Sequence, residues 1–363
     1  MSAVNLSYRE NFFRAMRRRD PEFVPFTYVF TGALVAKLRQ ETGRADIERS
    51  LESRFYHARN GLRKVVAEPT KNMNDYSKYY SGRNLSADAI VSEWGVAHQP
   101  DGYMHCESPL ADISGIHDIE NYPAPDLGRP YRWQNKKAEV DALHAGGFIV
   151  KGDTISTYET ARSLRGPENF LVDIYENRLW CEALIEKIFN VNMERIENMV
   201  PTGIDVLFLG DDVGAQQSMM FAPQIWRDLF KPRFRSYIAL AKKINPEILV
   251  FYHSDGNIFD IIPDLIEIGL DILNPVQPEC MDPLLVKKEF GKHLSFWGTI
   301  GTQTTMPFGS VADVKGAAKK MIAEVGRGGG LCLAPTHVLE PDVPLKNIKA
   351  LIEAVEEYGK AYR

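Results

Sequence analysis

Histidine and aspartate residues, which commonly bind metal ions, follow two short apolar runs in the second half of the chain. His253 and Asp255 follow the run 248–251, and His337 follows the run 330–335. Successive side chains of a strand alternate between its faces, so His253 and Asp255 point the same way if the strand continues through Ser254. Neutral imidazoles and carboxylates bind zinc and other divalent transition metals. The pattern therefore predicts a metal site formed by His253, Asp255 and His337.

Two adjacent acids follow another apolar run, 206–210. Asp211 or Asp212 could complete four-coordination of the metal, or the fourth place could be left for the substrate. The histidines and the adjacent aspartates also have purely structural interpretations. A histidine at a strand end often hydrogen-bonds a neighbouring carbonyl, and an aspartate in a turn often caps the next helix. The residue types alone leave these alternatives open.

The elements that must position these residues are eight short apolar runs separated by helical patterns. The runs cover 26–30, 91–96, 147–151, 206–210, 248–253, 271–274, 294–298 and 330–334. Runs that are apolar almost throughout are typical of parallel strands covered on both faces. Eight of them with intervening helices predict a (β/α)8 TIM barrel, an α/β fold whose strand ends meet at one mouth. A doubly wound open sheet is the alternative, but no G-x-G-x-x-G motif follows an early strand.

We expect a single barrel domain over residues 1–363, with long loop insertions in the N-terminal half. The links 31–90 and 99–146 exceed what a minimal barrel needs, and such loops often form lids or subunit contacts. At the other end, apolar residues recur every three or four positions from Leu345 to Tyr358 and predict a final helix. Around the mouth, strand ends also deliver polar side chains, among them Asn274 after the sixth run and Gln303 after the seventh.

Composition excludes several classes of function. The chain has 363 residues, 44% of them hydrophobic and 25% charged, with a formal charge of -5. This charge provides no electrostatic footprint for nucleic acid or an anionic membrane. No apolar stretch approaches the roughly 20 residues of a spanning helix, and the start lacks the apolar centre of a signal peptide, so we expect a cytoplasmic protein. The four distant cysteines favour neither a disulfide framework nor a zinc ribbon.

Four segments resemble a known family. Residues 6–26, 203–216, 251–277 and 332–355 are similar to the uroporphyrinogen decarboxylase superfamily, which also contains zinc-dependent methylcobamide:coenzyme M methyltransferases. The resemblance extends from about residue 7 to 360. It implies a (β/α)8 barrel with its site at the C-terminal mouth, in agreement with the strand count, and a homodimer.

The methyltransferase branch of that family binds zinc through a His-x-Cys motif after the fifth strand and a Cys after the eighth. The matching positions here are His253, Asp255 and His337, so both cysteines are replaced by other ligands. Thiolates keep a bound thiol nucleophilic, whereas an Asp/His set is harder and leaves a more Lewis-acidic metal, better suited to polarising oxygen. Coenzyme M is therefore not the expected acceptor.

The decarboxylase branch has an arginine-rich motif after its first strand and an aspartate after its second. Here the corresponding segments are Phe30-Thr31-Gly32-Ala33 and Ser92-Glu93-Trp94-Gly95, and only His337 matches a histidine of that branch. A substrate with many carboxylates needs several fixed cations. The expected positions do not supply them.

The resemblance thus implies a metal-dependent methyltransferase, with zinc or another divalent transition metal as cofactor. It would move a methyl group between a small methylated substrate, a corrinoid (cobalamin-type) partner protein and an acceptor. His253, Asp255 and His337 would hold the metal, and Asp211 or Asp212 would act as fourth ligand or general acid. Four further polar residues would orient the substrate: Glu93, Gln217, Asn274 and Gln303. The alternatives are a metal-independent decarboxylase using the same acids and His337, and a corrinoid carrier, although the D-x-H-x-x-G signature of such carriers is absent.

Overall fold

Seven parallel strands form one curved sheet whose order follows the chain. The computed structural model describes residues 6–52, 61–83, 85–98 and 106–360. The sheet runs in the order β1-β5-β6-β7-β8-β9-β10. Its strands are β1 (Leu62–Lys64), β5 (Ile149–Asp153), β6 (Val206–Gly210), β7 (Leu249–His253), β8 (Ile272–Asn274), β9 (Ser295–Ile300) and β10 (Leu331–Pro335). Because each strand is parallel to its neighbours, all their carboxyl ends lie at one edge.

The segment 26–30 extends this sheet beyond β10. Isolated parallel bridges join Phe26 to Leu333 and Phe30 to Leu339. The Thr27 amide donates to the Leu333 carbonyl, and the Leu333 amide donates to the Pro25 carbonyl. With this segment in the first position, eight extended segments surround the interior, and the predicted α/β barrel is confirmed.

One predicted strand is wrong, and one real strand was missed. Residues 91–96 do not join the barrel, because Gly95 (φ +81°) turns the chain back between β2 (Ile90–Val91) and β3 (Ala97–His98). These strands form a small antiparallel sheet with β4 (Cys106–Glu107). The second barrel position belongs to β1, which has only three residues and contains Arg63 and Lys64. A short strand with two charged side chains lacks the apolar signal on which the prediction depended.

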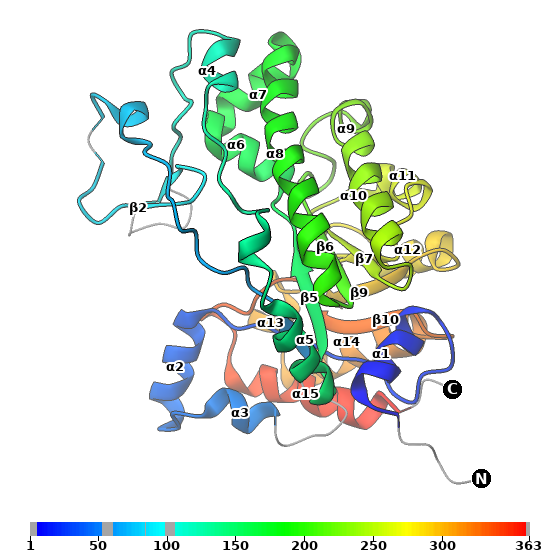
Figure 1. Cartoon of the computed structure of the whole chain (residues 1–363). Coiled ribbons are helices and arrows are strands. Elements are labelled where there is room, and N and C mark those ends of the chain that lie inside the picture. Colours follow the sequence, from blue (N-terminus) through cyan, green and yellow to red (C-terminus); the bar gives the residue numbers. More distant parts are fainter. Residues whose placement is uncertain (1–5, 53–60, 84, 99–105, 361–363) are drawn as a thin grey trace.

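Helices cover the outside of the barrel. The longer ones are α2 (Gly32–Thr42), α5 (Lys136–Ala145), α6 (Thr157–Arg165), α7 (Pro167–Glu176), α8 (Arg178–Met199), α10 (Lys231–Ile244), α12 (Pro283–Phe290), α14 (Val311–Glu324) and α15 (Leu345–Tyr358). Shorter ones are α3 (Ile47–Glu52), α4 (Ile116–Glu120), α9 (Pro223–Leu229), α11 (Ile262–Glu267), α13 (Thr305–Phe308) and the 3-10 turns η1 (Ser77–Tyr80), η2 (Pro130–Arg132), η3 (Val200–Thr202) and η4 (Phe259–Ile261). The final helix α15 has the predicted bounds. Figure 1 shows α8 and α10 packed together outside the sheet, and the segment carrying β2 extending away from it.

The barrel interior is a closed apolar core plugged at its N-terminal end by helix α1 (Tyr8–Met16). Fully buried Phe12 of α1 meets the Trp297 ring at 5.3 Å between centroids. Above it, Phe208 and Phe251 stack at 3.7 Å, and both contact Trp297 edge-on. Large side chains therefore fill the lower barrel, as in other barrels of this type. Above this packed layer, a cavity opens toward the carboxyl ends of the strands.

The long N-terminal links fold beside the barrel, although residues 53–60, 84 and 99–105 lie outside the described part. Tyr76 of the first link and Tyr122 of the second stack at 5.4 Å between ring centroids, so the two links pack against each other. The Tyr122 hydroxyl donates to the Trp94 carbonyl.

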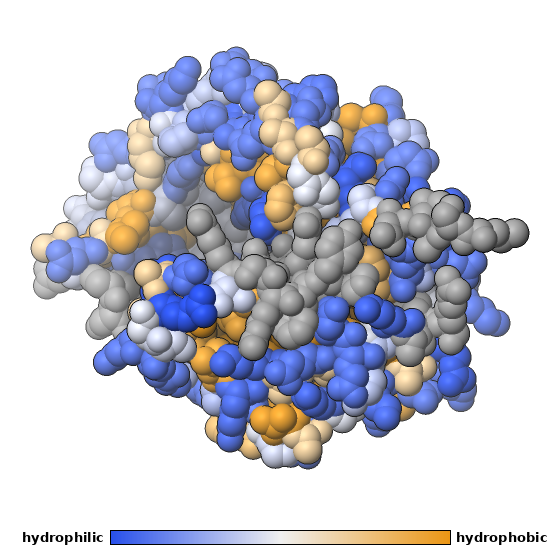
Figure 2. All heavy atoms as spheres, turned by 90° about the horizontal axis from the view of Figure 1, so that it is seen from below, coloured by the Kyte–Doolittle hydropathy of each residue, from blue (hydrophilic) through white to orange (hydrophobic). Residues whose placement is uncertain are grey.

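On the face in Figure 2, hydrophilic residues alternate with several small apolar groups. Within the described residues, every helix is too short or too polar to cross a bilayer.

Candidate active site

A pocket of about 380 Å³ opens at the carboxyl ends of the barrel strands. Phe208, Phe251 and Trp297 form its floor. Its walls come from the segment 27–29 and from every strand of the large sheet, with the loops that follow several of them. The lining residues that carry polar or charged side chains are Thr27, Tyr28, Lys151, Asp153, Thr154, Ser156, His253, Asn274, Thr336 and His337. The predicted position of the site at this mouth agrees with where the pocket lies.

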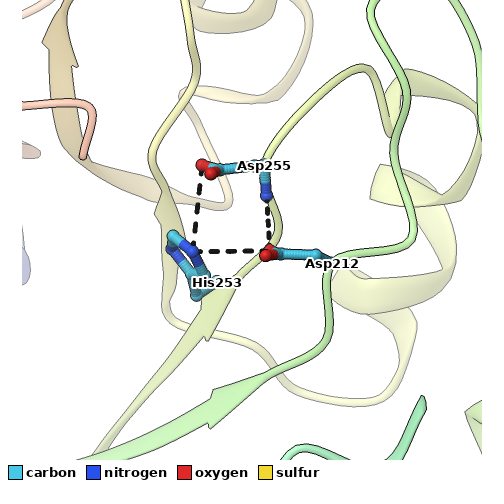
Figure 3. A group of neighbouring side chains, drawn as sticks. All are labelled: Asp212, His253 and Asp255. Atoms are coloured by element: carbon cyan, nitrogen blue, oxygen red, sulfur yellow. Dashed lines mark hydrogen bonds and ion pairs between the residues drawn. The ribbon is translucent and has the colours of Figure 1, made fainter. Parts of the chain in front are cut away.

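Asp212, His253 and Asp255 meet beside this pocket, and we call them the Asp–His–Asp cluster (Figure 3). His253 Nε2 lies 3.4 Å from Asp212 Oδ1 and 3.8 Å from Asp255 Oδ1. One ligand atom from each residue falls within 4.8 Å of the others. His253 ends β7, and the two aspartates come from the loops after β6 and β7. Adjacent parallel strands thus deliver all three groups.

Hydrogen bonds orient the imidazole toward the two acids. His253 Nδ1 lies 2.5 Å from Asn274 Oδ1, and Asn274 Nδ2 donates to the Trp297 carbonyl at 2.6 Å. Because the Asn274 amide nitrogen is committed to that carbonyl, its oxygen faces Nδ1 and accepts the proton there. The neutral ring then presents the Nε2 lone pair to the cluster. Metal-binding histidines are typically held in one tautomer by a bond of this kind.

The loops after β6 and β7 approach each other so closely that only glycine fits. A Cβ atom on Gly214 would lie 2.4 Å from the Asp255 carbonyl oxygen, and Gly256 has φ +79°. The Asp255 amide donates to Asp212 Oδ1 at 2.9 Å, and the Gly256 amide donates to Gln277 Oε1 at 2.7 Å. These contacts fix the backbone of both aspartates. The cluster is therefore positioned before any ligand arrives.

Electrostatics at the cluster favour a bound cation. Burial raises the pKa of the Asp255 carboxyl; His253 opposes this shift, while Asp212 adds to it. Asp255 Oδ1 is buried and has no hydrogen-bond partner within the described residues. An unpaired buried carboxylate oxygen is costly unless a proton or metal ion satisfies it. One imidazole and two carboxylates fit zinc or a similar divalent ion and leave a coordination position open.

Asp211 turns away from the cluster and caps a helix. Its side chain is fully buried, and Oδ1 accepts the Tyr158 amide at 2.6 Å in the first turn of α6. The sequence offered the next helix as the capped element, whereas the contact is with α6, which precedes Asp211 in the chain. Burial, followed by the nearby Glu159 charge, raises the pKa of the Asp211 carboxyl. Asp212, not its neighbour, is the acid delivered to the cluster.

Removal of the Asp211 cap should lower stability without loss of metal. We expect Asp211→Ala to reduce the free energy of unfolding by about 1–2 kcal/mol, the usual effect of losing a helix N-cap. Asp211→Asn keeps an acceptor oxygen and should cost less than half as much. Urea unfolding of metal-free protein measures both. Loss of bound metal in Asp211→Asn would contradict this role and make Asp211 a ligand.

The other predicted residues lie at different distances from the cluster. His337 lines the pocket, with its Nε2 4.0 Å from Asp255 Oδ2 and about half of its side chain exposed. The exposed Gln303 exchanges hydrogen bonds with Gln216 at the rim, and the exposed Gln217 accepts from Asn257 through its backbone. Asn274 lines the pocket and is the most buried of the four predicted substrate-orienting residues.

Glu93 does not line the pocket. Both of its carboxylate oxygens pair with the buried Arg132, at 2.5 and 2.9 Å. Its predicted position at the end of the second barrel strand was wrong, because residues 92–95 form a turn of the small sheet. The end of the second strand is instead Lys64, which pairs with Asp153.

Three charged residues near the pocket were missed. Lys151 and Asp153 of β5 point into it, and Glu159 on α6 lies close enough to Asp212 for their charges to interact. Burial, with the Asp212 charge, raises the pKa of the Glu159 carboxyl. A signal for β5 existed: Lys151 and Asp153 alternate with Gly152 at the end of an apolar run. Charged residues two apart on one strand face share that face.

The fold and the polar pocket at its mouth define an α/β-barrel enzyme. The chain belongs to the uroporphyrinogen decarboxylase (URO-D) family, whose model matches residues 115–358. Curated relatives include the methylcobamide:CoM methyltransferase MtaA of Methanosarcina barkeri, 29% identical over 160 residues. That match spans only 44% of this chain and 44% of the relative. A uroporphyrinogen decarboxylase of Hydrogenobaculum sp. (strain Y04AAS1) is 22% identical over 76% of this chain and 80% of its own.

A solved structure supports the fold over the whole chain. A methyltransferase from Methanosarcina mazei superposes with a TM-score of 0.67, at 17% identity, covering 98% of this chain and 99% of its own. At this identity the likeness establishes the shared barrel, not a shared substrate. The relatives include both methyltransferases and decarboxylases. Which of the two activities fits this chain has to be argued from its site.

Proposed function

We propose that this protein is a metal-dependent methyltransferase acting on a small methylated substrate. The observation that carries the proposal is the Asp–His–Asp cluster, in which an oriented imidazole and an unpaired buried carboxylate oxygen converge beside the pocket. Zinc or another divalent transition metal fits this donor set. The similarity to MtaA over part of the chain favours methyl transfer within the family.

Asp212, His253 and Asp255 would hold the metal, with the fourth place open to substrate or to His337. A metal bound there supplies Lewis acidity, which polarises an oxygen or stabilises a deprotonated acceptor. Asn274 keeps the proton on His253 Nδ1 and so leaves Nε2 available. Burial and the Asp212 charge raise the pKa of the Glu159 carboxyl, and this residue would serve as general acid for a leaving oxygen near the cluster.

We infer that the methyl group passes to or from a corrinoid on a partner protein. The name of the Methanosarcina barkeri relative, a methylcobamide:CoM methyltransferase, supports such a partner. The pocket opens at the rim formed by His337 and the strand-end loops. A corrinoid is too large for a pocket of about 380 Å³, so it would meet the substrate at this opening.

Decarboxylation of a porphyrinogen is the second candidate, because the decarboxylase relatives match more of the chain. The described pocket lining argues against it. Lys151 is its one lysine or arginine, whereas a substrate with many carboxylates needs several such partners. The pocket volume of about 380 Å³ is also at the small end for ligand sites.

Metal removal and restoration test the proposal. We expect protein stripped with a chelator to lose methyl transfer, both from methylated compounds to cob(I)alamin and from methylcobalamin to acceptor compounds, and to regain it with one equivalent of zinc or cobalt. Corrinoid absorbance follows both reactions. Release of carbon dioxide from uroporphyrinogen is measured in parallel on the stripped protein. Decarboxylation without metal, together with failure to bind zinc, would overturn the proposal and establish the second candidate.

A further inference from the structure

The pocket lining contains a lysine, Lys151, that the proposed chemistry does not use. Lys151 on β5 extends into the barrel, where its Nζ lies 3.9 Å from the centre of the Phe208 ring. About one fifth of its side chain is exposed, and burial lowers the pKa of its ammonium group. A lysine in an otherwise aromatic barrel floor is costly to bury. Such a residue is kept where its charge has a partner.

Lys151 and Lys64 share one carboxylate partner, Asp153. One positive charge is therefore not balanced within this group. Asp153 Oδ1 lies 3.1 Å from Lys151 Nζ, and Asp153 Oδ2 lies 2.5 Å from Lys64 Nζ. Burial acts to raise the pKa of the Asp153 carboxyl, but the two lysines outweigh it and lower that pKa. Among the described residues, Asp153 is the one carboxylate within 4.0 Å of Lys151 Nζ. Two ammonium groups and one carboxylate thus carry a net charge of about +1.

Lys151 and His253 of the Asp–His–Asp cluster line the same pocket. The order β5-β6-β7 places Asp153 and His253 two strands apart, with Gly210 on the strand between them. Gly210 lines the pocket and has no side chain to fill the gap. Below, the stacked Phe208 and Phe251 rings and the edge-on Trp297 ring form an apolar floor. A ligand on this floor would therefore have the Lys151 ammonium group and His253 of the cluster among its neighbours.

We propose that Lys151 selects a substrate carrying a carboxylate on a small apolar body, with the carboxylate bound by the Lys151 ammonium group. The reacting end of the substrate then faces the Asp–His–Asp cluster, a part of the inference that rests on the proposed function. Lys64 neutralises Asp153 and so leaves the charge of Lys151 for the substrate. The pocket therefore matches a ligand with an anion at one end and a metal-seeking oxygen at the other.

Binding of 4-methoxybenzoate and its uncharged analogue 4-methoxybenzamide tests Lys151 directly. Titration calorimetry on metal-free protein at pH 7 should show the acid binding at least about tenfold tighter than the amide, because the carboxylate accepts a charge-assisted hydrogen bond from the ammonium group. Lys151→Met keeps an unbranched apolar side chain without the ammonium group and should remove this preference. Lys137→Met, on the outside of α5, removes the same charge and should leave it intact.

For a second variant, Asp153→Asn, we expect the affinity for the acid to change in the opposite direction. Asp153→Asn frees both lysines from their carboxylate, so the acid should bind several-fold tighter than it does to wild type. Equal affinity for acid and amide in wild type, absence of binding by both, or a preference that survives Lys151→Met would overturn the inference. Metal content of Lys151→Met is measured separately and should equal that of wild type. Protein that prefers the acid but binds no metal would contradict the proposed function alone.

Discussion

Replacing His253 by alanine should abolish tight metal binding and, with it, methyl transfer. His253 provides the one nitrogen ligand of the Asp–His–Asp cluster. Its hydrogen bond to Asn274 directs the Nε2 lone pair toward the two acids. Loss of a partner that merely orients a metal ligand typically costs about 10–100-fold in affinity. Loss of the ligand itself should exceed that range. Competition with a chromophoric zinc chelator measures the change, and circular dichroism confirms that the variant is folded.

His337→Ala is the matched control. Its imidazole lies at the same mouth, but its Nε2 is 4.0 Å from Asp255 Oδ2 and it stands outside the cluster. We expect metal affinity to fall by less than about tenfold, while transfer activity drops because His337 lines the pocket. Equal loss of metal in both variants would place His337 among the ligands and contradict the three-residue arrangement. Full metal occupancy of His253→Ala would overturn the cluster itself.

Asp255→Asn should produce two effects of opposite sign. Metal affinity should fall by more than about a hundredfold, because an amide is a much weaker ligand than a carboxylate. The metal-free protein should become more stable, by about 1 kcal/mol, because the substitution removes an unpaired charge around the buried Oδ1 atom. Urea unfolding with and without zinc measures both. A destabilised metal-free variant would show that Asp255 has a partner in the absence of metal.

The pH dependence of the metal-free protein follows from the same carboxyl. The pKa of Asp255 is raised above its ordinary value of 3.8 in the folded state. Between the ordinary and raised values the folded state keeps a proton that the unfolded state has released, so this residue lowers stability as pH rises through that window. Asp255→Asn should remove this part of the slope. Zinc should reverse its sign in wild type, because the ligand must be deprotonated to bind.

The local sequence was sufficient for most strands and for the position of two candidate site residues. The run 206–210 and the last helix coincide with β6 and α15, because long apolar patterns with clear ends depend on nearby residues. His253 and Asp255 were placed together correctly, since alternation along one strand is a local property. Glu93 was misplaced because the run 91–96 looks like a strand until Gly95 turns it. Nothing local revealed that three residues, Leu62–Lys64, fill the second position.

The sequence by itself determined the barrel class. It predicted the mouth as the place of chemistry, with His253, Asp255 and His337 as metal ligands and Asp211 or Asp212 as a fourth. Only the tertiary structure showed which acid lies in the cluster: Asp211 caps α6, while Asp212 accepts the Asp255 amide. It also brought Lys151 into the pocket. The physical reason is that parallel strands pair across long connections, so their register, and with it the side chains that meet, depends on packing of the whole barrel.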